Sequence, residues 1–140
     1  MKLDLTMPAF APLATALIVD DNEDIVYLLR LLLLREGFIV HTATDGRDAR
    51  HFIETSAPTD IVIADLMLPH VSGFELITDI RENLAWKHVP IIILSAKVTE
   101  GDVVRSLELG ANDYVTKPYN PQELSARVRR LVNLDRRAQG

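Results

Sequence analysis

Residues 60–73, DIVIADLMLPHVSG, decide the fold, because they hold a fully apolar run, Ile61–Ala64, that ends at Asp65. A short run in which every residue is apolar is typical of a strand covered on both faces of a parallel sheet. We predict further strands where similar runs occur, at residues 16–19, 38–40, 90–94 and, as a short edge, 113–116.

Segments with helical periodicity separate these strands. Residues 22–36 place apolar side chains at the i, i+3, i+4 spacing of an amphipathic helix, and Gly37 follows as its stop. A second helix surrounds Phe52, and three more begin at cap sequences near Ser72, Thr99 and Asn120. The strand–helix alternation, repeated five times, predicts an α/β fold: a doubly wound (βα)5 domain with a five-stranded parallel sheet and right-handed crossovers.

Composition excludes several classes of protein. The chain has 140 residues, of which 48% are hydrophobic and 25% charged, with a net charge of -5. This balance suits one soluble domain and gives no general attraction to nucleic acid or anionic membranes. There is no cysteine, so disulfides and thiolate sites are excluded. No apolar run reaches the roughly 18 residues of a transmembrane helix, and we expect a cytoplasmic protein.

The ends of the chain are expected to lie outside the domain. Residues 1–14 contain Pro8 and Pro12, and Asp4 stands where a signal peptide would carry positive charge. We therefore predict a disordered leader at residues 1–14, one domain at residues 15–135 and a tail at residues 136–140.

Polar residues follow the predicted strands. Asp20 and Asp21 follow the first strand and Asp65 the third, Ser95 ends the fourth, and Lys117 comes after the fifth. In open parallel sheets, ligands bind at the carboxyl ends of the strands. These five side chains are therefore candidates for one functional site.

Three carboxylates at one sheet edge repel each other, at a cost of about 4 kcal/mol for a pair of charges ~4 Å apart at an effective dielectric of ~20. A hard divalent cation would relieve this repulsion, and Mg2+ suits a site with few carboxylates that also receives phosphate oxygens. Such a site favours phosphoryl transfer, with Asp65 as the carboxylate nucleophile, Lys117 as a second positive charge and Ser95 as a hydroxyl donor.

The sequence resembles the receiver domain of two-component response regulators, the CheY-like family, from about Ala16 to Leu134. The stretches that carry the resemblance are LIVDDNED at residues 17–24, DIVIADLMLPHVSG at 60–73, PIIILSA at 90–96 and GANDYVTKPYNPQEL at 110–124. The resemblance implies the flavodoxin-like strand order 2-1-3-4-5. It also implies a signalling switch, a phosphoprotein of signal transduction, rather than an enzyme with a separate substrate.

The resemblance also implies residue roles. Asp65 matches the phospho-acceptor, Lys117 and Ser95 match the residues that assist it, and no organic cofactor is implied. The Mg2+ ligands would be Asp20 through water, Asp21 and Asp65 directly, and the backbone carbonyl of Met67. Lys117 precedes a proline, Pro118, and this bond is cis in the family.

Ser95 and Tyr114 are similar to the family's switch residues. Phosphorylation would draw Ser95 toward the phosphoryl oxygens and Tyr114 inward, changing the face formed by the fourth helix, the fifth strand and the fifth helix. Met67 and Lys97 lie at positions that tune the phosphoryl lifetime in the family.

The implied partner is a sensor histidine kinase or a histidine phosphotransfer protein in a phosphorelay, with no direct binding of nucleic acid or membrane. A homodimer through the switching face is left open, because Val103 and Leu134 stand where dimerising regulators often carry charge. The output domain, if one exists, is also left open.

Three other functions fit the sequence less well. An aspartate-nucleophile phosphatase would need an acidic residue two positions after Asp65, where Met67 stands. A nucleotide or flavin binder lacks the expected glycine-rich motifs. A degenerate receiver that acts only as an interaction module is disfavoured, because all five polar strand-end residues are present.

Overall fold

Five strands and five helices alternate along the chain. The computed structural model describes residues 13–97 and 99–139, with the backbone alone for residues 134–139. The strands are β1 (Thr15–Val19), β2 (Ile39–Ala43), β3 (Ile61–Ala64), β4 (Ile91–Ser95) and β5 (Asp113–Thr116). The helices are α1 (Glu23–Arg35), α2 (Gly46–Thr55), α3 (Gly73–Glu82), α4 (Glu100–Leu109) and α5 (Pro121–Gln139).

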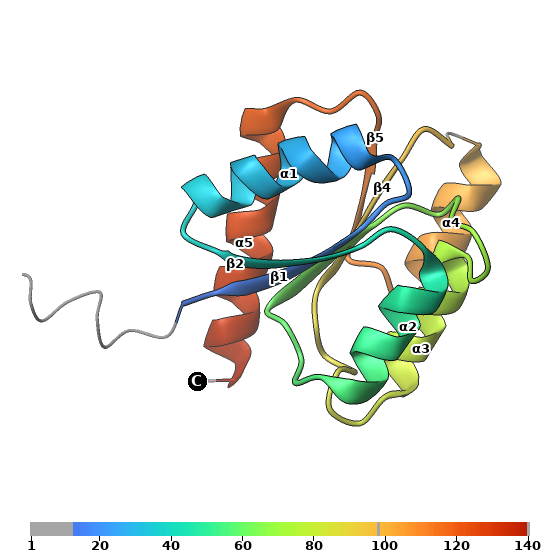
Figure 1. Cartoon of the computed structure of the whole chain (residues 1–140). Coiled ribbons are helices and arrows are strands. Elements are labelled where there is room, and N and C mark those ends of the chain that lie inside the picture. Colours follow the sequence, from blue (N-terminus) through green and yellow to red (C-terminus); the bar gives the residue numbers. More distant parts are fainter. Residues whose placement is uncertain (1–12, 98, 140) are drawn as a thin grey trace, which may run out of the picture.

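The strands form one parallel sheet in the order β2-β1-β3-β4-β5, which confirms the expected fold and strand order. Helices α1 and α5 cover one face of the sheet, and α2, α3 and α4 lie on the other (Figure 1). Two buried apolar clusters fill the space on either side. Ile18, Leu29 and Val128 belong to the first, and Val62, Ile77 and Trp86 to the second. Strands β3 and β4 are buried along their length and β1 is buried after Thr15, as expected of strands covered on both faces.

The helices begin at the expected caps. Ser72 and Glu75 form a complete capping box at α3, and the side chain of Thr99 accepts a hydrogen bond from the backbone of Asp102 at α4. The α1 helix begins at Glu23 with Asn22 as its cap, one residue later than predicted. Gly37 follows α1 with a positive φ of 93°, the conformation that favours glycine at a helix end.

Strand β2 is longer than predicted and begins one residue later. The apolar run ended at Val40, but pairing with β1 continues through His41 and Thr42 to Ala43. Strand β2 lies at the edge of the sheet, where polar side chains can face solvent while the backbone still pairs.

The predicted leader, residues 1–14, lies mostly outside the described residues, which begin at residue 13. At the other end, α5 continues to Gln139, so most of the segment expected as a tail continues the helix. Among the described residues, no helix is both long enough and apolar enough to cross a membrane.

Candidate functional site: an acidic cluster at the carboxyl ends of the strands

The five polar strand-end residues meet at one edge of the sheet. Asp20, Asp65 and Lys117 follow β1, β3 and β5, and Ser95 is the last residue of β4. These four strands are consecutive in the sheet order, so their carboxyl ends lie side by side. The sequence could predict this meeting because parallel strands share one carboxyl edge.

Asp65 is the centre of this group. It is 6% exposed, and its backbone N–H donates to the Val19 carbonyl, which continues the register of β1 and β3 past the end of the strand. Its Oδ1 accepts hydrogen bonds from Ser95 Oγ at 2.7 Å and from the Met67 N–H at 3.1 Å. Its Oδ2 accepts from Lys117 Nζ at 2.8 Å. Both oxygens are therefore held in fixed directions.

Lys117 connects two strand ends. Its Nζ lies 2.8 Å from Oδ2 of Asp20 and 2.8 Å from Oδ2 of Asp65. Burial lowers the pKa of Lys117, but the hydrogen bonds and charges of the two carboxylates outweigh burial, so the pKa lies above its ordinary value. Lys117 therefore stays charged beside Asp65. The bond from Lys117 to Pro118 is cis, as the resemblance implied.

Asp20 is the most buried carboxylate of the group, at 2% exposed. Burial raises its pKa, although hydrogen bonds from Lys117 and from the Asn22 backbone N–H act in the opposite direction. A raised pKa means that the ionised carboxylate is disfavoured where it lies. The removal of Asp20 from water, more than repulsion from Asp65, therefore disfavours its ionised form.

The acidic cluster fits a hard divalent cation. One carboxylate oxygen from each of Asp20, Asp21 and Asp65 lies within 4.8 Å of the others. Asp21 is exposed and pairs with no other residue in the part of the chain that the structure describes. Carboxylate oxygens of this kind, partly open to water, are the donors that Mg2+ prefers. Met67 lies beside the cluster, where its N–H contacts Asp65 and its side chain is 60% exposed.

Gly73 is a residue of the site that the sequence did not single out for this role. A Cβ at this position would lie 2.3 Å from the Asp65 carbonyl oxygen and 2.6 Å from the Leu66 Cα. The Gly73 N–H donates to the Leu66 carbonyl at 3.0 Å. The first turn of α3 therefore packs directly on the backbone that carries Asp65. The sequence signal was a glycine directly after the cap residue, Ser72.

The two predicted switch residues are connected to the site in different ways. Ser95 Oγ donates to Asp65 and also accepts from the Lys97 N–H at 3.2 Å. Tyr114 on β5 is half-buried against the apolar cluster under α2 and α3, and its hydroxyl donates to the Lys97 carbonyl. Burial raises the pKa of the Tyr114 phenol. The β4–α4 connection thus contacts both residues, and Ser95 already points toward Asp65.

A cleft of about 660 Å3 adjoins the cluster. Asp21, Met67 and Lys97 line it on the side of the acidic cluster, and Phe74 and Arg105 line it farther out. The Arg105 guanidinium lies 4.0 Å from the centre of the Phe74 ring, a cation–π contact between α3 and α4. The lining mixes polar and apolar side chains, and Asp21 is the member of the acidic cluster that lies on it.

The fold and the site together define a class of protein. A doubly wound parallel domain with clustered carboxylates, a hydroxyl and a lysine at its carboxyl edge is the arrangement expected for phosphoryl acceptance on an aspartate. A family model described as response regulator receiver domain matches residues 16–129. The chain belongs to the response-regulator receiver family.

Two curated relatives support this assignment. The chain is 45% identical over 116 residues to the alkaline phosphatase synthesis transcriptional regulatory protein PhoP of Bacillus subtilis, covering 83% of this chain and 47% of that protein. It is 41% identical over 139 residues to SphR of Synechococcus elongatus, a protein with the same description, covering 94% of this chain and 53% of SphR. The chain thus spans about half the length of the curated relatives it matches.

Solved structures are similar as well. A putative response regulator from Chloroflexus aurantiacus superposes with a TM-score of 0.81 at 34% identity, covering 87% of this chain and 99% of that one. The receiver domain of the sensor histidine kinase PA1611 from Pseudomonas aeruginosa has a TM-score of 0.79 at 30% identity, with 87% and 99% covered. That structure is described as having a magnesium ion coordinated in its active site cleft.

Proposed function

We propose that this domain accepts a phosphoryl group on Asp65 from a phosphohistidine of a sensor kinase or phosphotransfer protein, in a Mg2+-dependent reaction. The observation that carries the proposal is the set of contacts to Asp65. The Lys117 ammonium and the Ser95 hydroxyl both lie within 2.8 Å of the carboxylate that would react.

The transfer is an exchange of one bond for another. A carboxylate oxygen of Asp65 attacks phosphorus, the bond from phosphorus to the imidazole nitrogen breaks, and the imidazole leaves with the electron pair. Lys117 compensates negative charge on the transferred group, and the Ser95 hydroxyl can turn from Asp65 to donate to a phosphoryl oxygen. Water later hydrolyses the acyl phosphate and restores the carboxylate.

Asp20, Asp21 and Asp65 would hold Mg2+, with the Met67 carbonyl as a further ligand. When bound, the ion would stabilise negative charge on the transferring oxygens. The burial of Asp20 supports this assignment, because a bound cation would stabilise the ionised carboxylate that burial disfavours.

We infer from the same contacts how phosphorylation would change the domain. Phosphorylation would act through Ser95, Lys97 and Tyr114 on the face of α4, β5 and α5. The domain is then a switch that catalyses only its own phosphorylation and dephosphorylation, and we expect it to act in the cytoplasm, where its kinase would meet it. The bounds of the domain, residues 15–135, remain a prediction.

Dimerisation through α4, β5 and α5 also remains a prediction. On this face Arg127 is already paired within the chain, with Asp113 at 2.8 Å and Glu123 at 3.0 Å. Val104 and Leu107 of α4 are 46% and 44% exposed, which leaves an apolar strip beside these pairs.

The experiment is incubation with an acyl phosphate, with and without Mg2+, followed by measurement of intact mass. We expect the gain of one phosphoryl group only with Mg2+, and none in Asp65→Asn. The matched control is Asp24→Asn, which removes an exposed carboxylate outside the cluster and should be phosphorylated like the wild type. Equal phosphorylation of Asp65→Asn and wild type would refute the assignment.

A further inference from the structure

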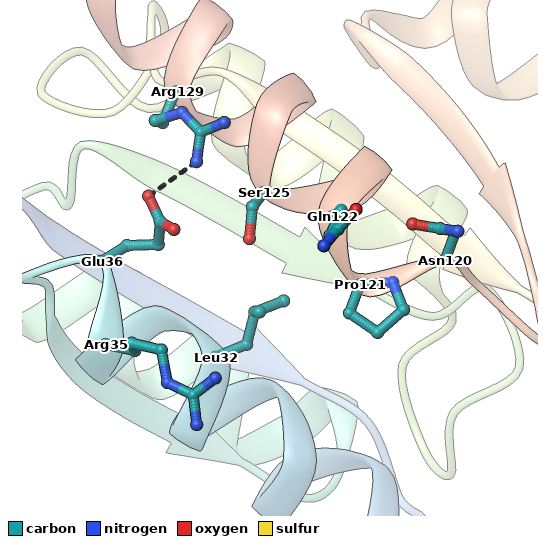
Figure 2. Close-up of a pocket in the computed structure, with 8 residues that line it drawn as sticks. All are labelled: Leu32, Arg35, Glu36, Asn120, Pro121, Gln122, Ser125 and Arg129. Carbon is teal, nitrogen blue, oxygen red and sulfur yellow. Dashed lines mark hydrogen bonds and ion pairs between the residues drawn. The ribbon is translucent and has the colours of Figure 1, made fainter.

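A second cleft, separate from the acidic cluster, lies between α1 and α5. Its volume is about 670 Å3, within the range of roughly 300–1,000 Å3 usual for small-molecule sites. Figure 2 shows its walls: Leu32 and Arg35 from the last turn of α1, Glu36 directly after that helix, and Pro121, Ser125 and Arg129 from α5.

Ser125 is the feature that marks this cleft as a site. The residue is 4% exposed, and its hydroxyl points from α5 into the space between the helices (Figure 2). Within residues 13–97 and 99–139, Ser125 Oγ has no hydrogen-bond partner. Its oxygen is not among the fully enclosed polar atoms that lack a partner in the described part of the chain, so it opens into the cleft. A ligand in the cleft would therefore replace water as the hydrogen-bond partner of Ser125.

The charges around Ser125 indicate the kind of ligand. Arg129 lies 2.9 Å from Glu36, but a guanidinium has five N–H donors, so most of them stay available. Arg35 forms no ion pair with any residue that the structure describes. Two arginines and one glutamate give the cleft a net charge of about +1, in a chain whose net charge is -5. The start of α5 adds the positive end of a helix dipole.

We propose that the α1–α5 cleft binds a small ligand bearing an oxyanion, a carboxylate or a phosphate. The oxyanion would accept hydrogen bonds from Ser125 Oγ and from the Arg129 guanidinium, while Arg35, whose side chain points away from Ser125 in Figure 2, would add positive charge at the edge of the cleft. Leu32 and Pro121 would contact the carbon skeleton of the ligand. Bidentate contacts from arginine and a hydroxyl donor are the groups that recognise such anions in proteins. The site is independent of Asp65.

The test is an NMR titration of the full chain, without divalent cations, using inorganic phosphate in one arm and succinate in the other. We expect saturable shifts of the backbone amides of Leu32, Arg35 and Ser125 in at least one arm. The arm that saturates at the lower concentration identifies the preferred oxyanion.

Variants decide whether the shifts report this site. Ser125→Ala and Arg129→Gln should each weaken binding about tenfold or more, as expected for the loss of a hydrogen bond to a charged group. The matched control is Arg130→Gln, the same change at the next, exposed position of α5, which does not line the cleft and should bind like the wild type. Shifts that never saturate in either arm, that centre on Lys117, or that persist unchanged in Ser125→Ala would overturn the proposal.

Discussion

At the scale of single residues, Asp20 is a predicted Mg2+ ligand whose burial affects the stability of the metal-free fold. Its carboxylate is buried and its pKa is raised, so the ionised form is unfavourable in the metal-free fold. For a group whose pKa is higher in the folded state, the contribution to stability is full below the unfolded pKa. It is lost as the pH rises through the folded pKa.

The first prediction is therefore that Asp20→Asn stabilises the metal-free protein at neutral pH and reduces its response to Mg2+. A cation that binds only the folded state adds about 2.7 kcal/mol at 100 times its dissociation constant, and the variant should gain less. Urea unfolding with and without Mg2+ measures both effects. Asp24→Asn is the control and should keep the full response. An Asp20→Asn variant that is less stable without metal, yet responds fully to Mg2+, would contradict this interpretation.

Tyr114 leads to a prediction about alkaline pH. Burial raises the pKa of its phenol, so the same sign applies: its contribution is full below the ordinary phenol pKa of about 10 and is lost as the pH rises beyond it. We expect Tyr114→Phe to lose less stability than the wild type between neutral and strongly alkaline pH. Chemical denaturation across this range measures it. Tyr27, 61% exposed, offers the matched substitution Tyr27→Phe, which should leave the pH dependence unchanged.

At the scale of elements, the contact of α3 with the β3 end determines where Asp65 lies. The Gly73 position has no room for a side chain against the Asp65 carbonyl, so α3 and the acceptor loop must move apart if one is added. A substitution at Gly73 therefore tests how α3 positions Asp65, and it leaves every polar group of the site intact.

We expect Gly73→Ala to cost about 1–3 kcal/mol of unfolding free energy, as overpacking does, and to slow phosphorylation of the folded protein. The control is Gly101→Ala on α4, where a Cβ meets nothing within 4 Å. That change should stabilise the helix by roughly 0.5–1 kcal/mol and leave phosphorylation unchanged. Thermal unfolding and the rate of mass gain report the two effects, and equal phosphorylation rates in both variants would show that the α3 contact does not position Asp65.

The elements also show how far sequence reasoning reaches. Strands β3 and β5 have the predicted bounds. In each, a short stretch of strand-forming residues follows a turn and ends directly before a polar residue. The extension of β2 through His41 could not be predicted, because it depends on pairing with β1 rather than on its own side chains.

The candidate site divides in the same way. The topology of the parallel sheet predicts that Asp20, Asp65 and Lys117 meet. The double contact of Lys117 and the close approach of Gly73 depend on distances between residues far apart in the sequence. The α1–α5 cleft had no sequence signal, because residues from two separate helices form it.

At the scale of the whole molecule, the buried Trp86 and the carboxylate cluster lie at opposite ends of the sheet. Trp86 precedes β4, is fully buried, and donates from its indole nitrogen to the Ser56 carbonyl at 3.1 Å. Its ring packs edge-on against Phe52 of α2 at 6.0 Å between centroids. The carboxylate cluster lies beyond the other ends of the strands.

Trp86→Ala should therefore cost about 3–5 kcal/mol of unfolding free energy, the range for truncating a buried aromatic residue. The phosphorylation rate of the fraction that remains folded should stay close to that of the wild type. Leu84→Ala, at a side chain 85% exposed two positions away, should cost less than about 0.5 kcal/mol. Denaturation curves and mass measurements on the same samples separate stability from chemistry.

The most direct test of the central claim is to locate the phosphoryl group in the wild-type domain. An acyl phosphate on aspartate is reduced by borohydride to homoserine, and peptide mass mapping then identifies the modified position. We expect homoserine at position 65 alone, after phosphorylation in the presence of Mg2+. Homoserine at position 20 or 21, or no reducible acyl phosphate despite a gain in mass, would contradict the assignment of Asp65 as the acceptor.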